Sequence, residues 1–171
     1  MSEATKVPMI IKGLMIDPTS NSPIVVLRVQ DSDVFLPIWI GMFEASAIQM
    51  TLEGTSPPRP MTHDLLAESF ASLGAEVESV VIRDLIDNVF FATLHVRHGD
   101  EKVEIDARPS DALALALRVG ADVFVERSVL ERAKAVDLST VEPSGQEEGD
   151  EERLKRWFEG LGPDDLGKYT M

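Results

Sequence analysis

Two short stretches combine arginine, carboxylate and helix-start residues in a way that could bind a phosphodiester. The first runs over residues 59–66 and the second over residues 106–113. Helix N-termini offer unpaired backbone N–H groups to phosphate, and the arginine fork matches phosphate oxygens. If the two helix starts converge, they form one anion-binding hollow. The candidate phosphate-binding residues are Arg59, Arg108, Thr62 and Ser110.

Acidic residues near these helix starts could hold a divalent cation. Carboxylate oxygens suit Mg²⁺ and Mn²⁺, and a neighbouring histidine can take the proton of an attacking water. The candidate metal ligands are Glu44, Asp64, Asp106 and Asp111. The candidate catalytic residues are His63, Asp64 and Asp111. No organic cofactor is expected.

The same residues also fit ordinary helix starts, which need no catalysis. Thr62 and Ser110 suit N-caps, and Asp64 and Asp111 suit a first turn, where a carboxylate faces the positive end of the helix dipole. No single spacing among the acids is a metal signature. Both interpretations therefore stay open at the level of the residues.

The remaining aromatic and histidine residues favour structural roles. Trp39 is expected to pack in the core at a strand end, although it could also stack on a base. His95 lies within a strand and His98 beside a hairpin, so both are expected at the surface. None of the three is a strong candidate for chemistry.

Apolar runs separated by turn residues predict two similar sets of three strands followed by a helix. In the first half, strands are expected over residues 7–17, 23–30 and 33–40, and helices over 42–52 and 62–73. In the second half, strands are expected over 77–85, 89–98 and 102–107, a helix over 110–119, a short strand over 122–125 and a helical turn over 128–135. The predicted fold class is α+β.

The two halves align without gaps at an offset of 67 residues. Leu27 then falls on Leu94, and Glu44 on Asp111. Such a match indicates an internal duplication, although any two strand-helix units share some apolar periodicity. We therefore expect duplicated β-β-β-α units, over roughly 7–73 and 77–135, that form an antiparallel or mixed sheet with helices packed against it.

The C-terminal part differs in composition from the first 135 residues. Residues 1–135 are predicted to form one domain, residues 136–150 an acidic linker and residues 151–171 a C-terminal helix and tail. The tail helix would carry one apolar face. Its members are Leu154, Trp157, Phe158 and Leu161. Such a face has to pack either on this domain or on a partner.

Charge and composition limit the functional classes. Sixteen basic and thirty acidic residues give a net charge of −14, which disfavours unspecific binding to nucleic acid. The absence of cysteine excludes disulfides, thiolate metal sites and a cysteine nucleophile. The polar start resembles no export signal, and the apolar runs are shorter than the roughly twenty residues that span a bilayer. We expect a cytoplasmic protein with no membrane partner.

Three motifs in register resemble the bifunctional nuclease domain family. They cover residues 37–45, 59–66 and 105–114, and the resemblance extends over about residues 7–135. Residues 162–169 also resemble the tail of bacterial members. The resemblance implies cleavage of RNA and DNA, the activity with which plant members are credited. Plant relatives often carry a partner-binding helical hairpin module at the C-terminus, from which the single tail helix expected here departs.

Three hypotheses follow. The first is a nuclease that hydrolyses phosphodiester bonds in RNA or DNA with Mg²⁺ or Mn²⁺, with His63 as the base and Arg59 and Arg108 on the phosphate. The second is a non-catalytic homo-oligomeric regulatory or scaffold protein in which the Arg/Asp motifs are structural networks. The third is binding of a small anion or nucleotide without cleavage.

Overall fold

The computed structural model describes residues 5–133, 135–140 and 149–160. The strands are β1 (Lys6–Ile16), β2 (Pro23–Val29), β3 (Val34–Trp39), β4 (Ala75–Ile86), β5 (Val89–His98), β6 (Glu101–Ala107), β7 (Asp122–Glu126) and β8 (Val136–Asp137). The helices are α1 (Met42–Leu52), α2 (Thr62–Ser72), α3 (Pro109–Val119), α4 (Arg127–Arg132), α5 (Asp150–Glu159) and the 3₁₀ turn η1 (Leu138–Thr140). The α+β fold class is confirmed.

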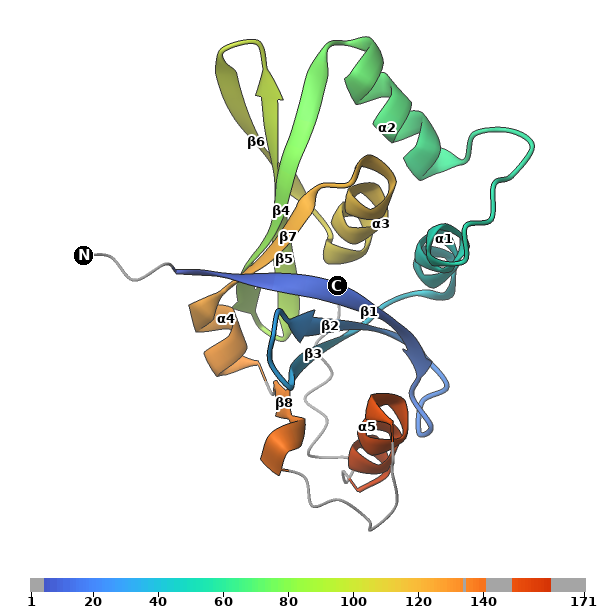
Figure 1. The fold of residues 1–171 in the computed structure, drawn as a ribbon, viewed down its shortest axis with the longest axis vertical. Coiled ribbons are helices and arrows are strands. Elements are labelled where there is room, and N and C mark those ends of the chain that lie inside the picture. Colours follow the sequence, from blue (N-terminus) through green and yellow to red (C-terminus); the bar gives the residue numbers. More distant parts are fainter. Residues whose placement is uncertain (1–4, 134, 141–148, 161–171) are drawn as a thin grey trace.

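A single mixed sheet of eight strands forms the centre of the described residues (Figure 1), in the order β6-β5-β4-β7-β1-β2-β3-β8. The strands β1, β2 and β3 form one antiparallel meander, and β4, β5 and β6 form another. β7 joins the two meanders, because it pairs parallel to β4 and antiparallel to β1. Both halves of the chain therefore contribute to one sheet.

The main core lies between the sheet and the helices α1 and α3. Alternate residues of β2 and β3 point into it, as the two-residue period of a strand requires. They are Val25, Leu27, Leu36 and Ile38. In α3 every residue from Pro109 to Ala116 except Asp111 is buried, whereas α2 has no buried residue. α3 is thus the central helix, with α1 and α2 beside it (Figure 1).

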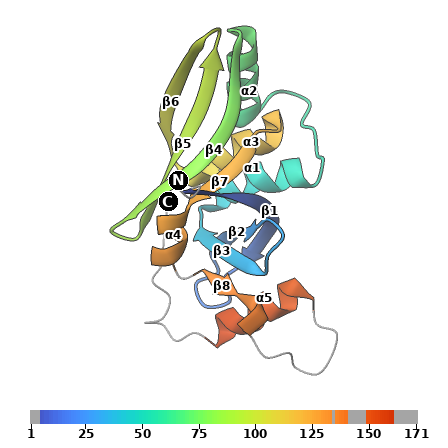
Figure 2. The ribbon, with the colours of Figure 1, turned by 60° about the vertical axis from the view of Figure 1, so that its left-hand side comes forward.

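A second, smaller core covers the other face of β2 and β3. Ile24, Val26, Phe35 and Trp39 form it together with Leu154 and Phe158 of α5. Figure 2 shows α5 beside β8, at the opposite end of the molecule from α2. The Trp39 and Phe158 rings meet edge to face with centroids 5.9 Å apart. The described part of the apolar face of the tail helix therefore packs on its own domain, while Leu161 lies outside the described residues. Trp39 is a core residue as expected.

The start of the expected acidic linker, residues 136–150, is folded rather than open. β8 pairs with β3, and Val136 and Leu138 are buried in the second core. The free energy gained by burying these two apolar side chains explains why this part of the chain folds although polar residues follow it in the sequence. Residues 141–148 and the tail motif at 162–169 lie outside the described residues.

Other element bounds agree with the predicted ones to within a few residues. The helical turn expected over residues 128–135 ends at Arg132 instead. The hairpins of the two halves also differ in register. In the first hairpin Leu27 pairs with Leu36. In the second, Leu94 pairs with Ile105, which lies two residues beyond the position equivalent to Leu36. A shift of two residues keeps the same side chains on the core face. The duplication itself stays a prediction.

Candidate functional site

α3 begins where the edge strand β6 ends. Arg108 is its N-cap, with an extended backbone (φ −71°, ψ 144°), and Pro109 is the first helical residue. Proline favours an extended residue before it and a helix after it. Ser110 was considered as the N-cap, but it lies inside the helix and is 1% exposed. Arg108 therefore occupies the N-cap, and its guanidinium reaches the carboxylate of Asp111 one turn on, at 2.8 Å.

α2 begins beside α3. Its N-cap is Met61, not Thr62 as the alternative interpretation expected. The Met61 N–H donates to Asp64 Oδ2 at 2.8 Å, so a first-turn carboxylate satisfies one of the open N–H groups at the helix start. This bond fixes the first turn of α2 and with it the position of His63.

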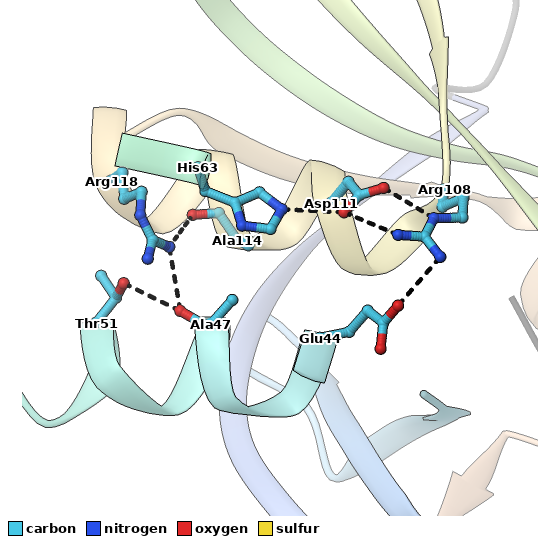
Figure 3. A network of polar contacts seen from close by, with 8 residues as sticks. All are labelled: Glu44, Ala47, Thr51, His63, Arg108, Asp111, Ala114 and Arg118. Atoms are coloured by element: carbon cyan, nitrogen blue, oxygen red, sulfur yellow. Dashed lines mark hydrogen bonds and ion pairs between the residues drawn. The ribbon is translucent and has the colours of Figure 1, made fainter. Parts of the chain in front are cut away.

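A line of polar contacts joins the three helix starts (Figure 3). His63 Nε2 lies 2.9 Å from Asp111 Oδ1. Arg108 donates to both oxygens of Asp111, at 2.8 and 3.2 Å, and to Glu44 Oε1 at 3.1 Å. Glu44 and Asp111 occupy equivalent positions of the two halves, and one guanidinium binds both. The two polar stretches that the sequence singled out therefore meet in space.

Gly41, the N-cap of α1, leaves room for the Glu44 carboxylate. A Cβ atom at this position would overlap Glu44 Oε2. The backbone angle of Gly41 is ordinary (φ −76°), so the conformation does not require a glycine here. A side chain at this position would displace the flexible end of Glu44, the carboxylate that reaches Arg108.

Arg118 is a member of the site that the sequence did not single out. Its side chain is only 9% exposed, and its Nε donates to Asp64 Oδ1 at 2.6 Å. Its NH1 group donates to the carbonyls of Ala47 and Ala114, at 3.1 and 2.8 Å. One guanidinium thus links α1, α2 and α3. The available signal was the spacing of seven residues from Asp111, which is two helical turns and places both on one face of α3.

A cavity of about 370 Å³ opens over these residues. Its lining includes Glu44, Thr62, His63, Arg108, Asp111 and Arg118, together with Phe43, Ser46, Ala47, Met50 and Met61. We call it the cleft. A second cavity of about 560 Å³ shares Met50 and Arg118 with the cleft and contains Arg59 and Asp64.

The ionisation of the site follows from these contacts. Partial burial raises the pKa of Asp111, but the hydrogen bonds from Arg108 and His63 outweigh it, and the net pKa is below the ordinary value. The backbone N–H of Met61 and the guanidinium of Arg118 lower the pKa of Asp64. The hydrogen bonds to Asp111 raise the pKa of Arg108. At neutral pH both aspartates are therefore anionic and Arg108 is cationic.

The candidate residues divide into two groups. His63, Asp111, Arg108, Thr62 and Glu44 line the cleft, while Asp64 and Arg59 line the adjoining cavity. Asp106 and Ser110 line neither. Asp106 is 72% exposed and bound to Arg83 at 2.8 Å, because it lies on the face of β6 opposite to Ile105. Ser110 is buried within α3.

The residues present do not fit a preformed divalent-cation site. Among the described residues, no three His, Asp or Glu side chains cluster so that they could share an ion. Both carboxylate oxygens of Asp111 accept hydrogen bonds, from Arg108 and His63. Both carboxylate oxygens of Asp64 do so as well, from Met61 and Arg118. A cation would have to displace the arginines first. The expected ligand set therefore does not assemble in this arrangement.

The comparisons with known proteins agree with the sequence motifs. Residues 25–137 match the model of a family described as the bifunctional nuclease domain. An uncharacterized protein of Mycobacterium tuberculosis is 40% identical over 157 residues, which make up 90% of this chain and 94% of that protein. Bifunctional nuclease 2 of Oryza sativa subsp. japonica is 29% identical over 137 residues, or 78% of this chain and 41% of that protein. Bifunctional nuclease 1 of Arabidopsis thaliana is 27% identical over 109 residues, which make up 61% of this chain and 34% of that protein.

In the part of the chain that the structure describes, no helix has the length and apolar character needed to cross a membrane.

Proposed function

Because the chain belongs to the bifunctional nuclease domain family, we propose that it hydrolyses phosphodiester bonds of RNA or DNA at the cleft. The observation that carries the proposal is the 2.9 Å contact between His63 Nε2 and Asp111 Oδ1, with Arg108 bound to the same carboxylate. A histidine oriented by a carboxylate, next to an arginine, is an arrangement suited to proton transfer beside a phosphate.

His63 is the proposed general base. With Asp111 ionised, Nε2 carries the hydrogen and donates it to Asp111, which leaves Nδ1 with the accepting lone pair. Nδ1 takes a proton from water as the water oxygen attacks phosphorus. The bond from phosphorus to the leaving oxygen then breaks, and that oxygen gains a proton from the imidazolium. The net change is the addition of one water, and Asp111 stabilises the transient imidazolium.

Arg108 is the proposed phosphate-binding residue. Its side chain is 55% exposed. A guanidinium has five N–H groups, and three of those on Arg108 donate to Asp111 and Glu44. The two others are available for phosphate oxygens. Thr62 lines the same cleft and provides a hydroxyl near the start of α2.

The proposed hydrolysis does not involve the cation expected from the sequence, because the described carboxylates of the site are bound to arginine and do not form a shared ligand set. A Mg²⁺ or Mn²⁺ requirement would mean that substrate or metal opens the Arg108–Asp111 pair.

Cleavage of labelled single-stranded RNA and DNA by purified protein tests the proposal. The wild-type chain and a His98→Ala control should cleave at the same rate, because His98 lies at the exposed end of β5. His63→Ala should be slower by about 100- to 10,000-fold. Equal cleavage by His63→Ala and wild type would point to a contaminant and remove the proposal.

A second candidate function is a non-catalytic oligomeric scaffold. The observation that favours it is a set of exposed apolar side chains on α1, on α2 and at the two caps of α2: Met42, Phe43, Met61, Leu65 and Leu73. Exposed apolar surface of this kind marks interaction sites. In this case the chain should sediment as a homo-oligomer, and Leu65→Ser with Leu73→Ser should dissociate it. A monomer at all concentrations would exclude the scaffold.

A further inference from the structure

The rim of the cleft carries an unusually exposed aromatic side chain. Phe43, on the first turn of α1, is 91% exposed, whereas Phe35, Phe90 and Phe158 are buried. A single exposed apolar residue needs no explanation by itself. The position of Phe43 is informative, because it lines the cleft and immediately precedes Glu44, which binds Arg108.

Phe43 continues into an apolar strip along α1. Ala47 and Met50 follow it at intervals of four and three residues, which place all three on one side of a helix. All three line the cleft, and Met61 adds a further apolar side chain from the start of α2. The cleft thus has an apolar strip along α1, beside Glu44 and Ser46, and a polar wall from α3 and His63.

The charges of the cleft give phosphate only limited attraction. Its lining contains two acids, Glu44 and Asp111, and two arginines, Arg108 and Arg118, so its formal charge is zero with His63 neutral. The whole chain carries −14. Phosphate contacts supply most of the affinity of ordinary nucleic-acid binders. A nucleic acid bound here needs an additional, uncharged source of affinity.

We propose that Phe43 stacks on a nucleobase of a single-stranded nucleic acid whose adjoining phosphate is bound by Arg108. The inference rests on the proposed function and adds the substrate class to it. Aromatic side chains bind bases of any sequence through their faces. A duplex covers those faces by its own stacking, so the site selects single strands, loops or ends. Met50, Ala47 and Met61 provide the apolar surface beside the base.

Paired oligonucleotides that differ only in their bases test this inference. The ligands are a single-stranded oligothymidylate of about ten nucleotides, an abasic oligomer with the same backbone, and a duplex of equal length. The proteins are wild type, Phe43→Ala, Phe43→Leu and Phe43→Trp. Phe43→Leu is the matched control, since leucine keeps the apolar surface and removes the aromatic face.

Phe43→Ala and Phe43→Leu should each lower the affinity for the oligothymidylate, and the rate of its cleavage, by roughly 5- to 150-fold. This is the range for loss of one base stack, about 1–3 kcal/mol. Phe43→Trp should retain wild-type affinity, and its additional tryptophan fluorescence should be quenched by the oligothymidylate. The abasic oligomer should bind all four proteins equally.

Three results would overturn the inference. One is a wild-type chain that cleaves the single strand while all Phe43 variants do so equally well. Another is a loss of affinity in Phe43→Ala that is equally large for the abasic and for the complete oligomer. The third is a change of sedimentation coefficient in Phe43→Ala without a change in binding, which would assign Phe43 to a contact between copies. A wild-type chain that neither binds nor cleaves any of the three ligands would instead refute the proposed function.

Discussion

His63 and Asp111 are 48 residues apart in the chain, and their side chains lie 2.9 Å apart. The contact connects the first turn of α2 with the first turn of α3, so residues from both halves form one polar group. Its geometry depends on three helices that a single arginine, Arg118, holds together.

Asp111→Asn should reduce kcat by about 100- to 10,000-fold and leave KM within a few-fold of wild type. The asparagine keeps the size of the side chain but no longer fixes the tautomer of His63 or stabilises its charged form. Steady-state kinetics on a single-stranded oligonucleotide measure both constants. An increase of KM alone would show that Asp111 acts in binding instead.

Arg118→Ala should lower the free energy of unfolding by about 2–4 kcal/mol, because it removes a largely buried guanidinium and its bonds to Asp64 Oδ1 and to two backbone carbonyls. Arg83→Ala is the matched control: its partner Asp106 is exposed, so the loss should stay under about 1 kcal/mol. Urea unfolding measures both values. Equal losses in the two variants would mean that Arg118 does not hold the helices together.

The pH dependence of stability should report on Asp64. Its pKa in the folded chain lies below the ordinary value of 3.8, so the bonds to Met61 and Arg118 contribute fully above that value. The contribution is lost as the pH falls through the lower folded-state pKa. Unfolding curves of wild type and Asp64→Asn should therefore differ at neutral pH and converge in acid. A constant difference between them across this range would contradict the assignment.

Mg²⁺ or Mn²⁺ at millimolar concentration should leave the melting temperature of the free protein unchanged. Only a ligand that binds the folded state raises it, and here the arginines occupy the carboxylates that a cation would need. Thermal melts with and without chelator measure this. A rise that Asp111→Asn abolishes would restore the metal mechanism expected from the sequence.

Phe158→Ala should destabilise the protein by about 3 kcal/mol, as large-to-small changes in a core do. Phe158 is 2% exposed and contacts the rings of Trp39 and Trp157. Trp39 fluorescence should shift to longer wavelength as water reaches the second core. Glu152→Ala, on the exposed side of α5, is the control and should change neither quantity. An unchanged stability in Phe158→Ala would show that α5 contributes nothing to the fold.

Sequence patterns predicted the strands and helices well, because alternating apolar residues and glycine stops are local signals. The convergence of His63, Arg108 and Asp111 in one cleft was one of two interpretations that the sequence left open, the other being ordinary helix starts. Asp106 was misplaced in the same set, although its alternation with Ile105 on a strand indicated the opposite face. Arg118 was missed because its spacing from Asp111 indicates only a shared face of α3, whereas its role depends on the packing of three helices.

The position of β7 has a consequence for how the chain folds. It pairs with β4 and with β1, and in the described part of the chain it is the only strand that borders both meanders. Its residues, Asp122–Glu126, come late in synthesis. The first meander, complete at Trp39, must therefore leave an open edge on β1 until β7, more than eighty residues further on, has been made, and closure of the sheet is a slow, non-local event.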